Sequence, residues 1–381
     1  MASIQRIESY FFERPLEREF HPAWIPGHAQ TANRCFILKL ITEDGLEGIG
    51  AASCFSEDQA RVLKVIVQDT IGQFLAGGDP VAVDAYANLV TRVGLMLGGR
   101  PWLVETALWD LIGKAEGKPL YRLWGGTSDD LPLYASTGEV NTVEHSPVQA
   151  IAAREAGFKA IKLRAHNADY HDDVVAVEAV RAAVGRSMKI LVDANQGWSL
   201  SPFGPKWDYE TALAYARDVA KYDIYWLEEP LDRFDFNGLA RLRANAEIRI
   251  AGGEMNQGLH EFQILLEKEA LDIYQPDATL AGGVLMARKV AELAREHGLT
   301  FSPHTWTTGI GFAINMHIAA SVANCPILEF PYEPASWSPQ ARDAMLTRPF
   351  LPENGFIRLP QGPGLGIELC PEAMAQYAKR L

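Results

Sequence analysis

The chain has 381 residues, 48% of them hydrophobic and 22% charged, and its formal net charge is −13. This is the composition of a globular protein that is long enough for two domains. The balance of 35 basic against 48 acidic residues argues against a general nucleic-acid binder, because such a protein needs a basic face to neutralise phosphates. It does not exclude an anionic substrate, since a metal ion and a few buried cations can reverse the local field.

The four cysteines, Cys35, Cys54, Cys325 and Cys370, stand far apart and without CxxC spacing. This spacing argues against a disulfide framework or a structural zinc site, and it favours buried thiols in a reducing cytoplasm. The first 19 residues lack the apolar stretch of a signal peptide. No uncharged apolar run reaches the roughly 18 residues that a membrane span needs, so we expect no membrane partner.

Residues 1–125 predict a small α+β capping domain, because strand patterns precede helical patterns without alternating with them. The tail, residues 354–381, is too short to be a domain, and we expect it to pack on this first one. The expected strands are Ile4–Phe12, Arg34–Ile41 and Leu46–Ala51, and the expected helices are Glu57–Leu75, Val81–Leu97 and Val104–Ala115.

Residues 126–353 have a different rhythm, in which short apolar strands alternate with helices at intervals of about 25 to 35 residues. Eight such strands predict a TIM-type barrel that carries the catalytic site. A doubly wound open sheet is the alternative, but no GxGxxG turn between a strand and a helix supports it. The expected strands are Leu131–Ser136, Lys159–Arg164, Lys189–Asp193, Ile224–Glu228, Ile248–Glu254, Ile273–Asp277, Thr300–His304 and Ile327–Phe330. The expected helices include Val174–Val184, Tyr209–Tyr222 and Val284–His297.

Acidic side chains stand at the C-terminal ends of three successive expected strands, which form the catalytic face of a barrel. These side chains are Asp193, Glu228 and Glu254. Any one of them alone is more often a helix cap or a surface charge. Together they can converge on one hard cation and leave room for water and substrate oxygens.

The next two expected strands end in Asp277 and His304. Neighbouring barrel strands would bring the carboxylate to one ring nitrogen, which fixes the tautomer and raises the basicity of the other nitrogen. A lone histidine is more often structural, but this position beside three carboxylates predicts a base. Lys162 and Arg164 stand two residues apart and therefore point to the same face of their strand. They are either cations of the site or solvated surface charges.

Short motifs form an ordered series along nearly the whole chain. They are Glu105–Ala115, Gly117–Leu120, Leu123–Gly126, Asp193–Gln196, Trp226–Pro230, Gly252–Glu254, Gln275–Asp277, Ala281–Gly283, Ser302–His304 and Gly362–Gly366. In this order they resemble the enolase superfamily, and within it the mandelate racemase subgroup. The resemblance implies a modified (β/α)7β barrel with an N-terminal α+β capping domain.

The resemblance also implies the chemistry of the site. Asp193, Glu228 and Glu254 would bind Mg²⁺, which binds the substrate carboxylate, and His304, held by Asp277, would remove the α-proton. The cation is needed because removal of a proton beside a carboxylate creates a dianionic enediolate, and only charges placed against it lower the barrier enough.

Further residues have expected binding roles. By the resemblance, Glu329 would donate a hydrogen bond to a substrate carboxylate oxygen as charge develops. Asn195 could bind substrate or a metal-bound water. Loops of the capping domain would close over the barrel, so His21 and Trp24, together with the stretch around Phe55, are candidates to contact the distal end of the substrate.

One position departs from the pattern of the family, which often has Lys-x-Lys on the second strand, with the second lysine as the base on the opposite face. Arg164 stands there, and an arginine stays protonated at any working pH, so racemisation with two bases loses support. Lys162 would neutralise the substrate carboxylate, although a lysine whose pKa is lowered by nearby cations could still act as a base.

We therefore expect dehydration of an acid sugar, an aldonate or aldarate, to a 2-keto-3-deoxy acid, in which His304 takes the α-proton and then protonates the departing β-hydroxyl. The alternatives are a cycloisomerase, racemase or epimerase of a related sugar acid, lactone or 2-hydroxy acid, and a barrel that only binds metal and an acid ligand. We also expect a small-molecule carboxylate as the partner, no nucleic acid, and a homo-oligomer, either a dimer or an octamer.

Overall fold

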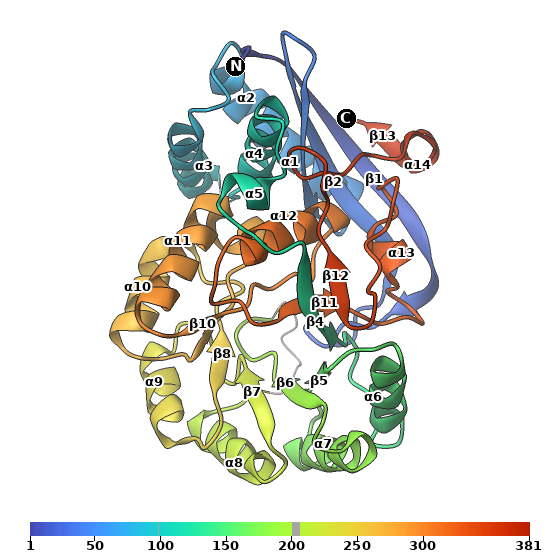
Figure 1. Ribbon diagram of the computed structural model, residues 1–381, viewed down its shortest axis with the longest axis vertical. Helices are drawn as coiled ribbons and strands as arrows, with labels where there is room; N and C mark the ends of the chain where they lie inside the picture. The colour runs from blue at the N-terminus through green and yellow to red at the C-terminus, as the bar shows by residue number, and fades with distance from the viewer. Residues whose placement is uncertain (98, 200–205) are drawn as a thin grey trace.

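The computed structural model describes residues 1–97, 99–199 and 206–381, and these residues form two sheets with their helices (Figure 1). An antiparallel sheet lies in the upper part of the view, together with both chain termini, and a curled parallel sheet surrounded by helices lies below it. A parallel barrel with a separate antiparallel domain confirms the expected fold class.

The upper sheet has the order β13–β1–β2–β3 and is antiparallel throughout. β1 (Ile4–Phe20) runs well beyond the expected end at Phe12, because β2 continues to pair with it through Pro15 opposite Ala32 and, after a shift in register, at Phe20 opposite Gln30. The C-terminal tail joins this sheet through β13, which pairs with β1. The other strands are β2 (Gln30–Thr42), β3 (Glu47–Ser53) and β13 (Ala378–Arg380).

The helices of the capping domain pack on one side of this sheet. The stretch that was expected as one helix, Glu57–Leu75, has a π-helical middle, η1 (Val65–Ile71), between two α-helical parts. Ser56 begins the stretch by accepting a hydrogen bond from the backbone N–H of Gln59. The helices are α1 (Glu57–Lys64), α2 (Gly72–Leu75), α3 (Val83–Leu97), α4 (Leu103–Ala115) and α5 (Leu120–Leu123).

Within the described residues, the lower sheet contains eight parallel strands in the order β10–β9–β8–β7–β6–β5–β4–β11, with seven α-helical connections between consecutive strands, and β12 pairs with β4 as an antiparallel addition. The two ends of the order approach each other where Ser302 Oγ donates to the backbone oxygen of Ile327 at 2.8 Å. The strands are β4 (Asp130–Ser136), β5 (Ala160–Arg164), β6 (Lys189–Asp193), β7 (Ile224–Glu228), β8 (Ile250–Gly252), β9 (Ile273–Tyr274), β10 (Thr300–Phe301) and β11 (Leu328–Pro331).

Helices surround the barrel in Figure 1, and none of the described helices is long and apolar enough to cross a membrane. They are α6 (His145–Glu155), α7 (Tyr170–Val184), α8 (Tyr209–Ala220), α9 (Phe236–Asn245), α10 (Gly258–Glu267), α11 (Gly283–Glu296) and α12 (Gly309–Ala320). The π-helical turn η2 (Ala278–Gly282) precedes α11, and α13 (Pro339–Arg342), β12 (Phe356–Arg358) and α14 (Pro371–Tyr377) follow the barrel.

Three strands of the barrel are shorter than the sequence predicts. β8, β9 and β10 end before Glu254, Asp277 and His304, which therefore lie on the loops that follow these strands. In two of these loops Pro276 and Pro303 precede the functional residue, and a proline has no N–H with which to continue a ladder.

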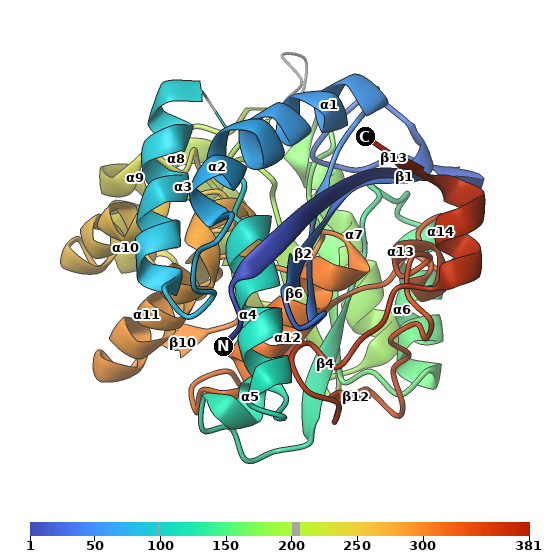
Figure 2. The ribbon, with the colours of Figure 1, turned by 90° about the horizontal axis from the view of Figure 1, so that it is seen from above.

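Helix α4 packs against both domains. It contains the Glu105–Ala115 motif, the first of the motifs that resemble the superfamily. It packs against β2 and β3 of the upper sheet and against α11 of the barrel (Figure 2). Glu105 accepts a hydrogen bond from the backbone N–H of Leu285 at 2.6 Å, and burial raises the pKa of this carboxyl to about 7. Asp110 accepts from the N–H groups of Ile49 and Leu365 at 3.0 and 2.8 Å, so one carboxylate holds both the sheet and the C-terminal segment.

Candidate active site

Three carboxylates converge at the C-terminal ends of the barrel strands. Asp193 ends β6, Glu228 ends β7, and Glu254 follows β8 after Gly253, whose φ of 119° favours a glycine. One oxygen of each carboxylate lies within 4.8 Å of the others, and all three side chains are buried. Burial raises the pKa of Glu228 and Glu254, with further contributions from Asp193. Such a set fits a hard divalent cation, because the cation supplies the charge that burial makes necessary.

Lys162 lies beneath the carboxylates and is fully buried. Its Nζ stands 2.6 Å from Glu228 Oε1, 2.7 Å from Glu329 Oε1 and 3.5 Å from Asp193 Oδ2. Burial disfavours its charge, but these carboxylates outweigh burial and raise its pKa above the ordinary value. The alternative that nearby cations lower the pKa of this lysine and let it act as a base therefore loses support, because the effect of the three carboxylates is larger than that of Arg164.

Arg164 is the second cation of the site, and its guanidinium group contacts a carboxylate, a backbone oxygen and two indole rings. Its Nη1 pairs with Asp193, and its Nε donates to the backbone oxygen of Thr137 at 2.6 Å. The indole rings of Trp24 and Trp306 lie 5.1 and 5.7 Å from its guanidinium carbon. Burial opposes its charge, but Asp193 raises its pKa above the ordinary value, so it stays a cation. We call Asp193, Glu228, Glu254, Lys162 and Arg164 the charged floor.

Glu329 is engaged in a different way from the hydrogen-bond donor that the resemblance implies. Its carboxylate accepts hydrogen bonds from Ser136 Oγ at 2.8 Å and from the backbone N–H of Thr305 at 2.7 Å, in addition to its ion pair with Lys162. Burial opposes ionisation, but Lys162 and His304 hold its pKa below the usual range. In this arrangement Glu329 is an anion that accepts hydrogen bonds.

His304 and Asp277 form the expected pair. His304 Nδ1 lies 2.9 Å from Asp277 Oδ2, and Nε2 lies 3.4 Å from Glu254 Oε2. The other oxygen of Asp277 accepts from Thr279 and from Asn315 Nδ2, at 2.7 and 2.9 Å. An acceptor held this firmly orients the ring so that Nδ1 carries its proton and Nε2 is the reactive nitrogen. Burial disfavours the charged ring, but the carboxylates of Glu254, Glu329 and Asp277 raise the pKa of His304 to about 10.

A cavity of 370 Å³ lies over this floor, between the loops of the barrel and those of the capping domain. Arg164 and Glu254 of the charged floor line it, together with His304 and Asn195 from the barrel and Trp24 and Phe55 from the capping domain. Asn195 has a φ of 47° and accepts from Arg164 Nη1 at 3.4 Å. The structure does not bring His21 into this cavity: its side chain is exposed, and its Nε2 lies 3.7 Å from Glu19.

Comparison with known proteins shows which family the chain resembles. A family model for the N-terminal domain of mandelate racemase and muconate lactonizing enzyme matches residues 6–125, and a model described as enolase C-terminal domain-like matches residues 147–373. The chain belongs to the mandelate racemase subgroup of the enolase superfamily.

Individual members of the superfamily are similar over most of their length. D-galactarolactone cycloisomerase of Agrobacterium fabrum is 31% identical over 72% of each chain, and arabinonate dehydratase of Saccharolobus solfataricus is 28% identical over 93% of each. A racemase from Streptomyces coelicolor, solved with bound magnesium, is 27% identical, with a TM-score of 0.84 over 99% of this chain and 100% of that one. The buried acidic triad and the expected chemistry agree with this membership.

Several residues of the site escaped the sequence analysis. Trp198 Nε1 donates to Glu254 at 2.6 Å, and Gln275 Nε2 and Trp226 Nε1 donate to Glu228 at 2.8 and 3.1 Å. Gln275 and Trp226 stand within superfamily motifs, so the motif offered a signal. Asn315 lies on α12, far along the chain from Asp277, and nothing in the local pattern marks it.

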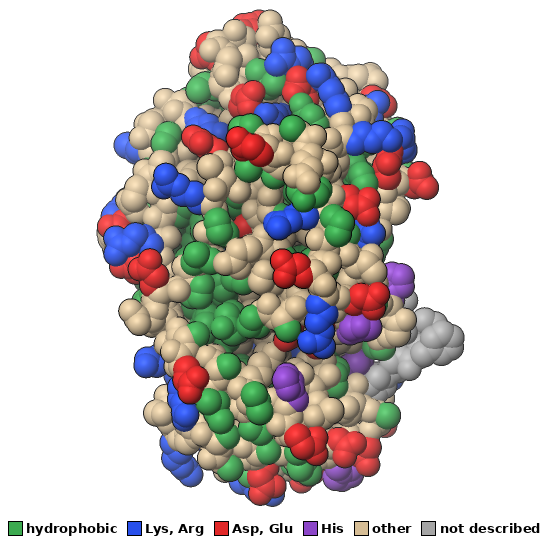
Figure 3. Space-filling view, turned by 90° about the vertical axis from the view of Figure 1, so that its right-hand side faces the viewer, with side chains coloured by type: hydrophobic (Ala, Val, Ile, Leu, Met, Phe, Trp, Pro, Cys, Tyr) green, Lys and Arg blue, Asp and Glu red, His purple; other side chains and the backbone are tan. Residues whose placement is uncertain are grey.

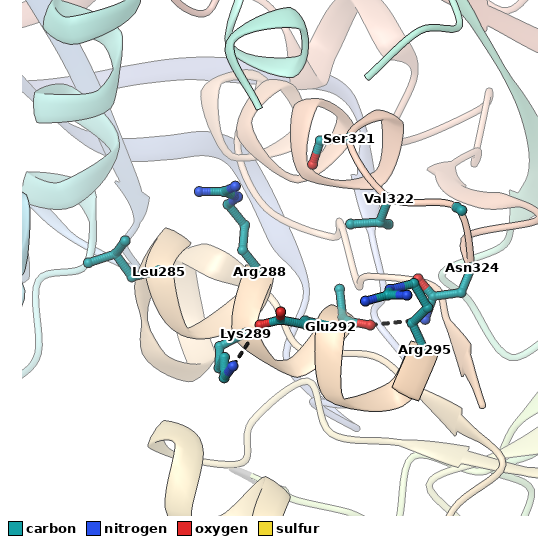
Figure 4. Close-up of a pocket in the computed structure, with 10 residues that line it drawn as sticks. Leu285, Arg288, Lys289, Glu292, Arg295, Ser321, Val322 and Asn324 are labelled. Atoms are coloured by element: carbon teal, nitrogen blue, oxygen red, sulfur yellow. Dashed lines mark hydrogen bonds and ion pairs between the residues drawn. The ribbon is translucent and has the colours of Figure 1, made fainter. Parts of the chain in front are cut away.

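A second hollow, of 490 Å³, lies on the outside of the barrel between α11 and residues 321–324 (Figure 4). Although it is larger, its charged side chains are those of an exposed helix face, and Glu292 pairs there with Lys289 at 2.6 Å. Arg288 lies over the indole of Trp124 at 4.7 Å. It contains neither a carboxylate triad nor a paired histidine among its lining residues, so we assign the chemistry to the cavity over the charged floor.

The outer surface agrees with the acidic composition. On the face in Figure 3, acidic and basic side chains are interspersed, and the basic ones do not gather into a continuous stripe. That face therefore lacks the footprint of a phosphate backbone.

Proposed function

We propose that this member of the superfamily uses His304 to remove the proton α to the carboxylate of an acid sugar. The observation that carries the proposal is the His304–Asp277 pair at 2.9 Å, whose other ring nitrogen, Nε2, belongs to the lining of the cavity and lies 3.4 Å from Glu254 Oε2. A base at this point is useful only if charge on the substrate is stabilised nearby, and the charged floor supplies that stabilisation.

We propose Asp193, Glu228 and Glu254 as ligands of Mg²⁺, since three buried carboxylates are hard ligands with a total charge that needs a cation. When bound, this ion would supply positive charge for the substrate carboxylate and for the negative charge that develops on proton removal. Lys162 keeps Glu228 and Asp193 in place from below. Arg164 closes the other side of Asp193.

For the overall reaction we propose dehydration of an aldonate or aldarate to a 2-keto-3-deoxy acid. His304 Nε2 accepts the α-proton, the C–H electrons move into the enediolate, and the C–O bond to the β-hydroxyl breaks as the same nitrogen returns the proton to the departing oxygen, which leaves as water. The enol that remains becomes the 2-keto acid. Arg164 stays charged and cannot act as a base on the opposite face, which favours a reaction with one base.

The second candidate is cycloisomerisation, which shares the step at His304 and differs in the leaving oxygen, here a ring oxygen of a lactone or ether. Relatives with this activity accompany the dehydratases: D-galactarolactone cycloisomerase and 3,6-anhydro-α-L-galactonate cycloisomerase from Streptomyces coelicolor, which is 28% identical over 98% of this chain. Racemisation and epimerisation have less support, because both need an acid on the other face.

The test is a set of acid sugars incubated with the enzyme and Mg²⁺ in D₂O, followed for deuterium at the α-carbon of the recovered acid sugar and for 2-keto acid that carries deuterium at C3. We expect His304→Asn to lower both by a factor of about 10² to 10⁴, whereas His297→Asn, a change in an exposed histidine at the end of α11, leaves them unchanged. Turnover retained by His304→Asn would remove this residue from the role of base. Inversion with deuterium uptake and without loss of water would replace dehydration by racemisation or epimerisation.

Three further expectations remain proposals: the division of the chain at residue 125, a homo-oligomer, and a place in the cytoplasm. The tail strand β13 on β1 supports grouping residues 354–381 with the capping domain. Size-exclusion chromatography with light scattering on the full chain tests the homo-oligomer, and a monomer would contradict it.

A further inference from the structure

The loops that follow β8 and β9 carry Glu254 and Asp277 into the active site, although both strands are short. Within the described residues, the last backbone hydrogen bond between these two segments runs from the N–H of Gln275 to the oxygen of Gly252 at 2.9 Å. Beyond that point each loop leads separately into its helix, α10 or α11, and these helices lie side by side in Figure 1. The position of Glu254 relative to the His304–Asp277 pair therefore depends on side-chain contacts.

Gln257, three residues after Glu254, makes such a contact between the two loops. Its Nε2 donates to the backbone oxygen of Met255 at 3.1 Å and to that of Leu280 at 2.9 Å. Met255 is the residue next to Glu254, and Leu280 lies in the π-helical turn η2, which begins directly after Asp277. One amide group thus bridges the loop that carries a carboxylate of the charged floor and the loop that carries the partner of the base.

The turn η2 connects this bridge to the base. The backbone N–H groups of Leu280 and Ala281 donate to the backbone oxygen of Asp277 at 3.1 and 2.8 Å. The backbone N–H of Thr279 donates to the carboxylate of Asp277 at 2.7 Å, and this carboxylate holds Nδ1 of His304 at 2.9 Å. A shift of Leu280 would therefore move the carboxylate that orients the ring of His304.

The capping domain reaches the same amide group. Arg100, which stands shortly before α4, donates from Nη1 to Gln257 Oε1 at 3.4 Å. With two acceptors on one side and a donor on the other, only one orientation of the amide satisfies all of these contacts. Gln257 is not among the residues that line the cavity, whereas Met255 and Leu280 are. It can therefore act on the site only through these neighbours.

From these contacts we propose that Gln257 is a positioning residue, which fixes the carboxylate of Glu254 relative to the His304–Asp277 pair, and that Arg100 holds it from the capping domain. The inference rests on the proposed function, because it takes Glu254 as a ligand of Mg²⁺ and His304 as the base. Without the bridge, the ligand and the base can move apart while each keeps its own hydrogen bonds. Outer contacts of this kind typically contribute a factor of about 10 to 100 to metal affinity or activity.

The test is Gln257→Met, which keeps the length of the side chain and removes the amide. Titration calorimetry measures Mg²⁺ binding to the full chain, and we expect the dissociation constant to rise at least about tenfold. At saturating Mg²⁺, with the acid sugar that the wild type turns over fastest, kcat should fall at least about tenfold while KM stays within about threefold. Gln376→Met, the same exchange at an exposed position of α14, should leave these quantities unchanged.

Arg100→Met tests the contact from the capping domain and keeps both bonds to the carbonyl oxygens. It should change the Mg²⁺ dissociation constant and kcat in the same direction by a smaller, several-fold factor, whereas Arg92→Met, at an exposed position of α3, should not. The double variant should be no worse than Gln257→Met alone, because Arg100 acts through the amide.

Three results would overturn the proposal. The first is an unchanged Mg²⁺ affinity in Gln257→Met or in Arg100→Met, and the second is a kcat of Gln257→Met that recovers fully at saturating Mg²⁺. The third is a double variant in which the two factors multiply. The Mg²⁺ titrations need no substrate, so they decide the role of Gln257 even where the acid sugars are not turned over and the proposed function fails.

Discussion

The charged floor differs from the apolar side chains that line the same cavity, Trp24, Trp198, Met255, Leu280 and Trp306, which form an apolar wall. In the floor, Lys162 and Arg164 lie among more carboxylates than they can neutralise, and every group depends on its neighbours. In the wall, aromatic and aliphatic side chains pack without such dependence. The comparison teaches that the loss of one floor residue exposes an uncompensated charge, whereas the loss of one wall residue changes mainly which ligand fits.

The largest expected effect is at the centre of the floor. Lys162→Met in metal-free buffer should lower the free energy of unfolding by about 3–5 kcal/mol, because Glu228, Glu329 and Asp193 then face one another without their buried cation. Urea unfolding measures this loss. The matched control is Lys39→Met, which breaks a partly exposed pair with Glu47 at 3.0 Å and should cost at most about 1 kcal/mol. Equal losses of unfolding free energy in the two variants would contradict the special dependence of the charged floor on its buried cation.

The next prediction contrasts two buried histidines. Carboxylates raise the pKa of His304, whereas His317 accepts from the backbone N–H of Tyr121 at Nδ1 and donates from Nε2 to the oxygen of Leu365, at 3.2 and 3.1 Å. Burial lowers the pKa of His317 to about 4, below its ordinary 6.5. As the pH falls, this histidine takes up its proton in the unfolded chain before it does so in the folded one. The free energy of unfolding that the neutral, buried His317 contributes is therefore complete above pH 6.5 and declines toward pH 4.

The expected size of that decline is about 3 kcal/mol, at roughly 1.4 kcal/mol for each pKa unit. Urea unfolding of the wild-type chain and of His317→Gln across this range isolates the contribution, because other groups titrate in both. The variant should lose less stability than the wild type as the pH falls. If the free energy of unfolding changed with pH in the same way in both proteins, His317 would not remain neutral when buried.

Stabilisation of the fold by Mg²⁺ should depend on the three carboxylates of the charged floor. With free Mg²⁺ at 100 times its dissociation constant, the free energy of unfolding should rise by about 2.7 kcal/mol. Asp193→Asn should remove this rise, because it takes one ligand from the triad, whereas Asp172→Asn, at an exposed position of α7, should keep it. A rise that survives Asp193→Asn would place the ion elsewhere.

The smallest effect concerns the wall. Trp306→Phe removes the N–H that donates to Ser136 Oγ and keeps an aromatic ring, so the free energy of unfolding should fall by about 1 kcal/mol more than in Trp337→Phe. Trp337 is the control because its Nε1 is buried without a hydrogen-bond partner in the described structure. Equal losses, compared by thermal or urea unfolding, would mean that the bond to Ser136 contributes nothing to stability.

Much of the fold was open to prediction from local patterns. Alternating apolar strands and helices predicted the order of the eight barrel strands, and β6 and β7 have the bounds that the pattern indicates. The predicted C-terminal ends of β8, β9 and β10 were wrong. Apolar residues followed by Gly or Pro resemble a strand in sequence whether or not a neighbouring strand pairs with them. The length of β1 escaped prediction for the opposite reason, since pairing with β2 extends it through a charged stretch.

The sequence by itself determined that Asp193 and Glu228 end two barrel strands and that Glu254, Asp277 and His304 follow the next three, because their places after apolar segments are local and the superfamily motifs name them. Only the tertiary structure decided what each polar atom contacts. Lys162 of β5 meets Glu329 of β11, although β4 lies between these two strands, and the indole N–H of Trp198 donates to Glu254. Such contacts depend on side-chain direction and on segments distant in sequence, and hydrogen bonds are directional while residue spacing is not.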